Sequence, residues 1–256
     1  MSKKYVLITG ASSGIGKSIA ERFAKSGMNL VLVASRIEKL QKTADEIKAN
    51  YNVEIFCSAK NLSVDDSAQK IYDELQNNNI EVDVLVNCAG IGGSGEYSES
   101  DWAKQKAIID VDVIALMHMT RLFLPQMLER KDGVICNIAS NAGFAPLASQ
   151  PVYGAAKAYV ISFSQALYEQ VKDRGVCVSV YCPGPTNTAF FERNGFELAN
   201  LSGSSPDDVA EDIYNFIQKR KAFASFGAKN KFMAVATRLL PRKTVREIAA
   251  KMGASK

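Results

Sequence analysis

Short apolar runs alternate with longer amphipathic stretches along most of the chain. The apolar runs show no alternation of apolar and polar residues, which is typical of strands covered on both faces. We predict strands at Tyr5–Thr9, Leu30–Ala34, Val53–Ser58, Val84–Asn87, Gly133–Ala139 and Val176–Cys182. We predict helices at residues 14–27, 37–50, 64–77, 101–130, 153–174 and 206–220.

The repeated order of strand, helix and strand indicates parallel pairing with right-handed crossovers. We therefore predict an α/β fold with a single doubly wound parallel sheet and helices on both of its faces. In such a sheet, ligands bind outside the carboxyl ends of the strands, where the strand order reverses. The residues directly after each apolar run are therefore the first candidates for chemistry.

Composition narrows the class of protein. The 256 residues are 47% hydrophobic and 23% charged, which excludes a disordered chain, and no apolar run approaches the roughly 20 residues of a membrane helix. The chain enters its first strand almost at once, so we expect no signal peptide and a soluble, cytoplasmic protein. The five cysteines form no CxxC motif and are expected to be buried free thiols, and a single histidine, His118, argues against a metal site.

A glycine-rich turn follows the first predicted strand. It reads Thr9-Gly10-Ala11-Ser12-Ser13-Gly14-Ile15-Gly16 and leads directly into an amphipathic helix. Glycines there allow a tight turn and let a phosphate approach the helix N-terminus, whose free N–H groups and dipole favour anions. The turn predicts a dinucleotide site in a Rossmann-type sheet, with the candidate binding residues Gly10, Ser12, Ser13, Gly14, Ile15 and Gly16.

The end of the second predicted strand bears on the choice of dinucleotide. NAD(H) is usually held there by an acidic residue that accepts a hydrogen bond from the ribose. This chain has Ser35 and Arg36 at that turn and no acid. A guanidinium can bind a 2′-phosphate, which a carboxylate would repel. We therefore expect NADP(H), with Ser35 and Arg36 as binding residues; a solvated Arg36 is the alternative.

Four motifs in order resemble the short-chain dehydrogenase/reductase family. They are the glycine turn at 9–16, Asn87-Cys88-Ala89-Gly90, Ser140, and Tyr153 with Lys157, where Tyr153 lies thirteen residues after Ser140. The segment Pro183-Gly184-Pro185-Thr186-Asn187-Thr188 is similar to the loop after the sixth strand of that family. The resemblance covers about residues 4–225 and implies an NAD(P)-dependent oxidoreductase.

Tyr153 and Lys157 are four residues apart on one predicted helix, so their side chains share a face. A free tyrosine is a poor acid or base at neutral pH, and we expect the nearby ammonium and the positive nicotinamide to favour the phenolate and pull its pKa toward the operating range. The resemblance implies that Tyr153 protonates the carbonyl oxygen of a substrate during hydride transfer from NADPH. It also implies that Ser140 hydrogen-bonds that oxygen and that Lys157 holds the nicotinamide ribose.

The chain departs from the family in two places. Asp112 stands where the family usually has an Asn that completes a proton relay. The second departure is Lys60-Asn61-Leu62, where the family commonly has an aspartate that lies against the adenine of the cofactor. We expect Asp112 to act in catalysis, and Asn61 and Leu62 to contact the adenine. The remaining candidate cofactor residues are Asn87, Ala89, Gly90, Pro183, Gly184, Thr186 and Thr188, together with Tyr153 and Lys157.

Aromatic residues mark the expected substrate lid. Phe190, Phe191 and Phe196 lie in it, and Phe144 and Leu147 follow Ser140. With Ser140, Phe144 and Phe190 as candidate contacts, we expect a hydrophobic ketone or aldehyde (3-oxoacyl or ketosteroid-like). The alternative is that these rings only pack the lid onto the body.

Charge is divided unevenly along the chain. Residues 1–218 carry a net charge of −6 and residues 219–256 a net charge of +10. In the basic tail, Phe232, Ala236, Leu239 and Leu240 share one helical face, and Val245, Ile248, Ala249 and Met252 share another. We favour packing of these faces against the body or a sister subunit, and keep open a weak peripheral contact with anionic lipid or an acyl carrier. No nucleic-acid-binding pattern is present.

We expect residues 1–225 to form a dinucleotide-binding catalytic domain with a substrate lid at about 186–205, and residues 226–256 to form a basic amphipathic extension. The resemblance implies a homodimer or homotetramer paired through helices 101–130 and 153–174. Two function classes remain open: an NADPH-dependent carbonyl reductase acting on a small-molecule carbonyl or alcohol, and a dinucleotide-binding sensor or interaction protein with little turnover. Ser140, Tyr153 and Lys157 favour the enzyme, whereas Asp112 favours the sensor.

Overall fold

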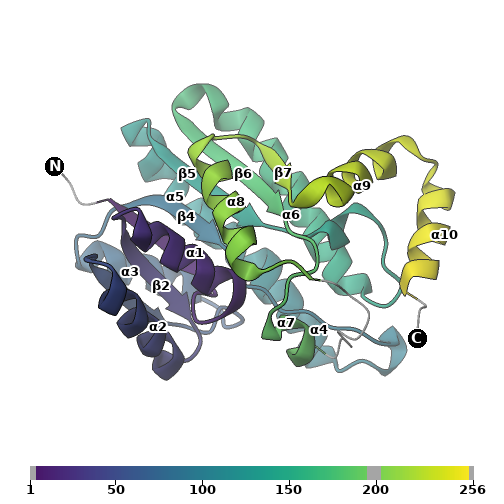
Figure 1. Cartoon of the computed structure of the whole chain (residues 1–256), viewed down its shortest axis with the longest axis horizontal. Helices are drawn as coiled ribbons and strands as arrows, with labels where there is room; N and C mark the ends of the chain where they lie inside the picture. The colour runs from purple at the N-terminus through teal and green to yellow at the C-terminus, as the bar shows by residue number, and fades with distance from the viewer. Residues whose placement is uncertain (1–3, 195–202, 254–256) are drawn as a thin grey trace.

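A seven-stranded parallel sheet forms the centre of the computed structural model, which describes residues 4–194 and 203–253 (Figure 1). Its strands follow the order β3-β2-β1-β4-β5-β6-β7. The strands are β1 Tyr5–Thr9, β2 Asn29–Ala34, β3 Ile55–Ala59, β4 Val82–Asn87, β5 Gly133–Ile138, β6 Val176–Cys182 and β7 Phe223–Ser225. The predicted doubly wound α/β sheet is confirmed.

Helices connect the strands and cover both faces of the sheet (Figure 1). They are α1 Gly14–Lys25, α2 Ile37–Asn50, α3 Ser67–Asn77, α4 Trp102–Ile109, α5 Leu116–Arg130, α6 Pro151–Val171, α7 Ala189–Arg193, α8 Pro206–Gln218, α9 Gly227–Leu239 and α10 Arg242–Gly253. Short 3₁₀ turns lie at Tyr97–Glu99, Asn141–Phe144 and Lys172–Arg174. None of the helices in the described part of the chain is long and apolar enough to cross a membrane.

Alternate side chains of β1 enter opposite halves of the core. Val6 and Ile8 belong to the hydrophobic cluster beneath α1, α2 and α8, whereas Tyr5 and Leu7 belong to the cluster beneath α3 and α5. The strand is therefore buried on both sides, which explains why its sequence shows no alternation of apolar and polar residues.

Two short elements escaped the sequence prediction. Strand β7 has three residues and helix α7 has five, too few for a periodic pattern to be visible. The predicted helix 101–130 is present as α4 and α5, which are joined by a π-helical segment at Asp110–Ala115. A π segment inserts extra backbone into a helix and often lies at a functional site.

The strand order reverses between β1 and β4, since β2 and β3 lie on one side of β1 and β5, β6 and β7 lie beyond β4. The loops after β1 and β4 therefore diverge at this point and leave a crevice at the carboxyl edge of the sheet.

The cysteines are all free; Cys136, Cys177 and Cys182 are buried, but Cys57 and Cys88 are only half-buried, contrary to the expectation of full burial.

Candidate active site

A cavity of about 490 Å³ lies at the carboxyl edge of the sheet, beside the reversal of strand order. The loops after β1, β4, β5 and β6 line it, together with α6 and α7. Of the predicted site residues, those that line it are Gly10, Ser13, Gly14, Ile15, Gly16, Gly90, Ser140, Tyr153, Lys157, Pro183, Gly184, Thr186, Thr188 and Phe190. These residues come from six separate stretches of sequence.

The backbone of the glycine turn at 9–16 packs closely against the start of α1 beside the cavity. Gly10 has a φ of +71°, a conformation that other residues rarely adopt. A Cβ on Gly16 would lie 2.5 Å from the carbonyl oxygen of Gly10, so no side chain fits there. The glycines therefore allow the turn to pack closely against the start of α1, and Ser13, Gly14 and Ile15 at that helix N-terminus line the cavity, where a phosphate can approach.

Several predicted cofactor residues do not line this cavity. Ser35, Arg36 and Asn61 are exposed beyond the ends of β2 and β3, and the Oδ1 atom of Asn61 accepts a hydrogen bond from the backbone of Ser63. Leu62 packs against the hydrophobic cluster that includes Ile71 of α3. The structure therefore does not bring this group of residues to the cavity.

Ser12, Asn87 and Ala89 do not line the cavity either. Asn87 is buried, and its Nδ2 donates to Thr120 at 3.2 Å and to Asn137 of β5 at 2.9 Å. The side chain of Asn87 therefore ties β4 to the neighbouring strand β5. Ala89 lies against Gly10: a Cβ added to Gly10 would lie 3.0 Å from the Cα atom of Ala89.

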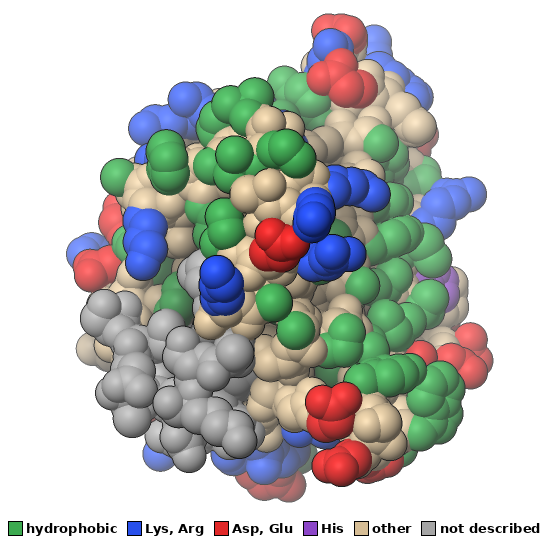
Figure 2. Space-filling model, turned by 90° about the vertical axis from the view of Figure 1, so that its right-hand side faces the viewer, with side chains coloured by type: hydrophobic (Ala, Val, Ile, Leu, Met, Phe, Trp, Pro, Cys, Tyr) green, Lys and Arg blue, Asp and Glu red, His purple; other side chains and the backbone are tan. Residues whose placement is uncertain are grey.

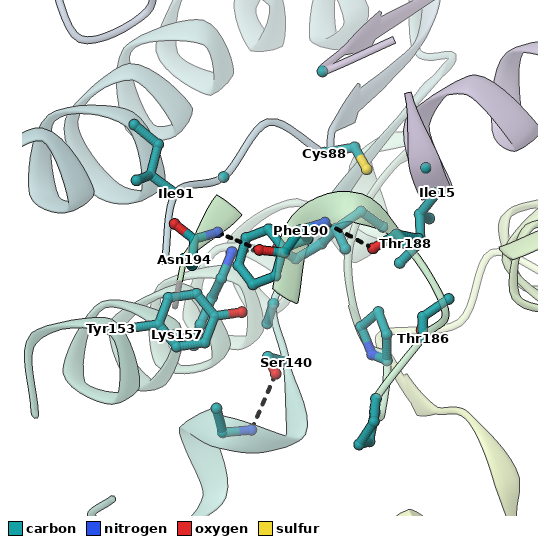
Figure 3. Close-up of a pocket in the computed structure, with 18 of the residues that line it drawn as sticks. Ile15, Cys88, Ile91, Ser140, Tyr153, Lys157, Thr186, Thr188, Phe190 and Asn194 are labelled. Atoms are coloured by element: carbon teal, nitrogen blue, oxygen red, sulfur yellow. Dashed lines mark hydrogen bonds between the residues drawn. The ribbon is translucent and has the colours of Figure 1, made fainter. Parts of the chain in front are cut away.

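Tyr153 and Lys157 project from the first turns of α6 into the cavity, close to Ser140 on the loop after β5 (Figure 3). Pro151 begins this helix, a position at which a missing N–H costs no hydrogen bond. Tyr153 is 9% exposed and Lys157 is 5% exposed. The ammonium of Lys157 lies 5.6 Å from the centre of the Tyr153 ring.

Asp112 is fully buried in the π-helical segment, next to Lys157. Its Oδ2 lies 3.0 Å from the Nζ of Lys157, and its Oδ1 accepts a hydrogen bond of 2.8 Å from the backbone N–H of Ile91. Lys157 also donates to the carbonyl of Ile138 at 3.2 Å. The carboxylate of Asp112 and the carbonyl of Ile138 together fix the position of the ammonium.

Burial and the neighbouring charges shift the pKa values of Tyr153, Lys157 and Asp112 in opposing directions. Burial raises the pKa of the Tyr153 phenol above its ordinary value; Lys157 opposes this rise and Asp112 adds to it. Burial alone would lower the pKa of Lys157, but Asp112 and Tyr153 raise it to about 12. Burial also raises the pKa of Asp112, against the effect of Lys157.

Lys157 acts on the pKa of Tyr153 in the expected direction and lowers it, but desolvation of the phenolate is the larger effect and raises that pKa. Chemically, the pair can donate a proton to an oxygen atom in the cavity.

Two asparagines near Ser140 were not found from the sequence. The Oγ of Ser140 accepts from the N–H of Ala142 at 3.1 Å and donates to the Oδ1 of Asn141 at 3.3 Å. The Nδ2 of Asn141 in turn donates to the Oδ1 of Asn230 in α9 at 3.1 Å. This contact joins residues 89 positions apart, so no local pattern could have indicated it.

The wall opposite the glycine turn is largely apolar. The centre of the Phe190 ring lies 5.9 Å from the centre of the Tyr153 ring. Ile91 and Leu147 also line the cavity. Asn194, another residue not found from the sequence, is buried and donates to the carbonyl of Phe190 at 2.7 Å. This bond closes the end of α7 (Figure 3), and the Oδ1 of Asn194 accepts a hydrogen bond of 3.1 Å from the backbone N–H of Gly92, which ties α7 to the loop after β4.

Phe144 was expected to contact substrate but does not line the cavity. Its ring packs 6.2 Å from Phe223 of β7, within a separate hydrophobic cluster. The 3₁₀ turn after Ser140 directs it away from the opening. Phe196 and the side chain of Phe191 lie outside the described residues, as does most of the predicted lid beyond residue 194.

Comparisons with known proteins agree with this geometry. Residues 4–197 match the family model described as short chain dehydrogenase. The very-long-chain 3-oxoacyl-CoA reductase of Rattus norvegicus is 39% identical over 70% of this chain, but the match spans only 58% of that protein's length. The protein of the same name from Anas platyrhynchos is 33% identical over 96% of this chain and 79% of its own length.

Among solved structures, the chain is similar to a short-chain dehydrogenase from Sphingobium yanoikuyae in complex with NADPH. The TM-score is 0.85 at 27% identity, and the match covers 92% of this chain and 93% of that chain.

Proposed function

The chain belongs to the short-chain dehydrogenase/reductase family of oxidoreductases, and from this premise we propose that it reduces a hydrophobic ketone or aldehyde with NADPH. The observation that carries the proposal is the buried Tyr153 phenol between Ser140 and Lys157, facing a cavity with an apolar wall.

In the proposed reduction Tyr153 is the proton donor, and burial, which raises the pKa of its phenol, favours the protonated form that this role needs. Reduction of a carbonyl requires a proton at the oxygen, and Tyr153 delivers it while Ser140 hydrogen-bonds the same oxygen. Lys157, held by Asp112, remains charged and stabilises the phenolate that results.

NADP(H) fits the residues that are present. The glycine turn at the start of α1 lines the cavity and would bind the pyrophosphate, and Lys157, which also lines it, would hold the nicotinamide ribose, as the family resemblance implies. Arg36 is exposed beyond β2, where a 2′-phosphate of an extended dinucleotide would reach it. When bound, NADPH supplies the hydride for the carbonyl carbon. The NADPH complex of the similar Sphingobium yanoikuyae protein supports this choice.

The apolar wall and the names of the relatives support a 3-oxoacyl thioester as the substrate class. Phe190, Leu147 and Ile91 would contact the carbon chain beside the reacting carbonyl. The rat relative is named for the reduction of very-long-chain 3-oxoacyl-CoA. Ketosteroids and other bulky hydrophobic ketones fit the same lining.

The first test is NADPH consumption with a panel of 3-oxoacyl thioesters, ketosteroids, diketones and medium-chain or aromatic aldehydes. Turnover that prefers an apolar ketone is the expected result. If NADPH binds but no member of the panel is reduced, the proposal fails in favour of a dinucleotide sensor.

Arg36→Ala tests the choice of cofactor. Loss of a charge-assisted hydrogen bond to the 2′-phosphate should raise the KM for NADPH about tenfold and leave the KM for NADH unchanged. Lys39→Ala, an exposed cation nearby in α2, is the matched control. An equal change for both cofactors would show that Arg36 does not read the 2′ position.

A further inference from the structure

The helices α9 and α10 form the right-hand end of the molecule in Figure 1, beyond the edge strand β7. They are attached to the body by a few contacts. Ala234 of α9 and both Val245 and Ala249 of α10 are buried, and Arg238 donates to Gln165 of α6 at 3.3 Å. The predicted face of Val245 and Ala249 is therefore packed, although Ile248 is 47% exposed.

The apolar face of α9 is not packed. Phe232 is 76% exposed, Val235 is 58% exposed and Leu239 is 79% exposed. Their spacing of three and four residues places them along one side of the helix. Of the two partners expected for this face, the body does not cover it, because α9 turns Ala234 inward and leaves the large side chains outside; packing against a sister subunit stays a prediction. Leu240 extends the exposed stripe at 42%.

Basic side chains surround this stripe. Lys229, Lys231 and Arg238 belong to α9, and Arg242, Lys243, Arg246 and Lys251 to α10; all are exposed, and Glu247 is the one acid among residues 227–253. Figure 2 turns this end of the molecule toward the viewer, and its hydrophobic and basic side chains are interspersed. We call this surface, from Gly227 to Lys251, the basic apolar face.

We propose that the basic apolar face docks onto an anionic lipid surface, with Phe232, Val235 and Leu239 entering the headgroup region. An amphipathic helix with this composition lies in the plane of a membrane interface, where apolar burial and attraction to anionic lipid add together. Each Lys or Arg near such a surface gains further attraction.

A second copy of the chain is a poorer occupant. A symmetric contact between two identical faces would oppose like charges, since seven cations and one acid lie on each. The lipid surface offers negative charge and an apolar layer at the same time. Docking also brings the enzyme to the phase in which an apolar ketone concentrates, a consequence that rests on the proposed function.

Vesicle sedimentation with the full-length protein tests the proposal. Phosphatidylcholine vesicles containing phosphatidylserine should bind the protein at low ionic strength, and phosphatidylcholine alone should bind it weakly. Phe232→Ser with Leu239→Ser should weaken binding to the anionic vesicles about tenfold or more, because both side chains leave the apolar layer. Lys243→Glu with Arg246→Glu should weaken it similarly and reduce its dependence on salt.

Trp102→Ser is the matched apolar control, since this side chain is 70% exposed on α4, outside the basic apolar face. It should bind as the wild type does. Thermal unfolding confirms that each variant is folded. Wild-type affinity of the Phe232/Leu239 variant, or no binding of the wild type to anionic vesicles, overturns the proposal. A change in oligomeric state on substituting Phe232 and Leu239, without an effect on lipid binding, assigns the face to a second copy instead.

Discussion

Asp112 lies 3.0 Å from the ammonium of Lys157 and has no exposed surface. The sequence identified this residue as a departure from the family pattern. The contact depends on how the π-helical segment packs against α6, a tertiary feature with no local signal. Its carboxylate acts on Tyr153 from this position by raising the pKa of the phenol.

Asp112→Asn should therefore shift the pH dependence of reduction. Tyr153 donates its proton only at pH values below its pKa, so activity is lost as the pH rises through that pKa. Removing the negative charge of Asp112 lowers the pKa of Tyr153, and the alkaline limb of the kcat/KM profile should move to lower pH.

Asp110→Asn is the control for this measurement, because Asp110 lies in the same segment but pairs with Lys106 at the surface at 2.6 Å. Its profile should match that of the wild type. A wild-type profile in Asp112→Asn would mean that only the backbone at this position affects proton transfer.

At the scale of elements, α9 belongs to the active site as well as to the surface. Asn230 accepts a hydrogen bond from Asn141, whose own Oδ1 accepts from Ser140. Asn230 also contacts the loop after β6, because a Cβ added to Gly184 would lie only 2.3 Å from the Nδ2 of Asn230. The helix thus restrains the two loops that hold Ser140 and Pro183.

Asn230→Ala should lower kcat about threefold to tenfold and leave the KM for NADPH unchanged, since one neutral hydrogen bond that orients Ser140 through Asn141 is lost. Asn230→Asp keeps the accepting oxygen and should recover part of the loss. Asn215→Ala, which removes a comparable surface amide from α8, should have no effect. Equal losses in the Asn215 and Asn230 variants would contradict a positioning role.

The elements that the sequence predicted are those with long local patterns. β1 to β6 are apolar runs of five to seven residues. The glycine turn was predictable because Gly10 has a positive φ, which favours glycine, and the glycine is visible in the sequence. The direction of Phe144 was not predictable in this way, because its contact with Phe223 depends on β7, which lies 79 residues later. The same reason explains why Asn230 was not found.

At the scale of the whole molecule, a second exposed apolar surface lies on α5 and α6. Met117 is 36% exposed and Tyr159 is 37% exposed, with Ile114 of the preceding π-helical segment at 45%. These are the helices that the family resemblance indicates for pairing. We propose a homodimer or homotetramer through this surface, with residues 1–225 as the catalytic domain and residues 226–256 as a basic amphipathic extension whose helix α9 contacts the catalytic loops through Asn230.

Ile114→Glu with Met117→Glu should dissociate this assembly, because two buried carboxylates would face their own copies across the interface. Light scattering after gel filtration measures the mass. Val64→Glu, at a site that is 55% exposed near α3, should leave the mass unchanged. A mass that is the same in all three proteins would contradict pairing through α5 and α6.

The most direct test of the central claim follows deuterium from NADPH labelled on the nicotinamide into the best substrate of the panel. The wild type should give an alcohol with deuterium on the former carbonyl carbon, and Tyr153→Phe should give it at least about a hundredfold more slowly while binding NADPH normally. A Tyr153→Phe rate equal to the wild-type rate, or no deuterated alcohol from a wild type that binds NADPH, would contradict the account.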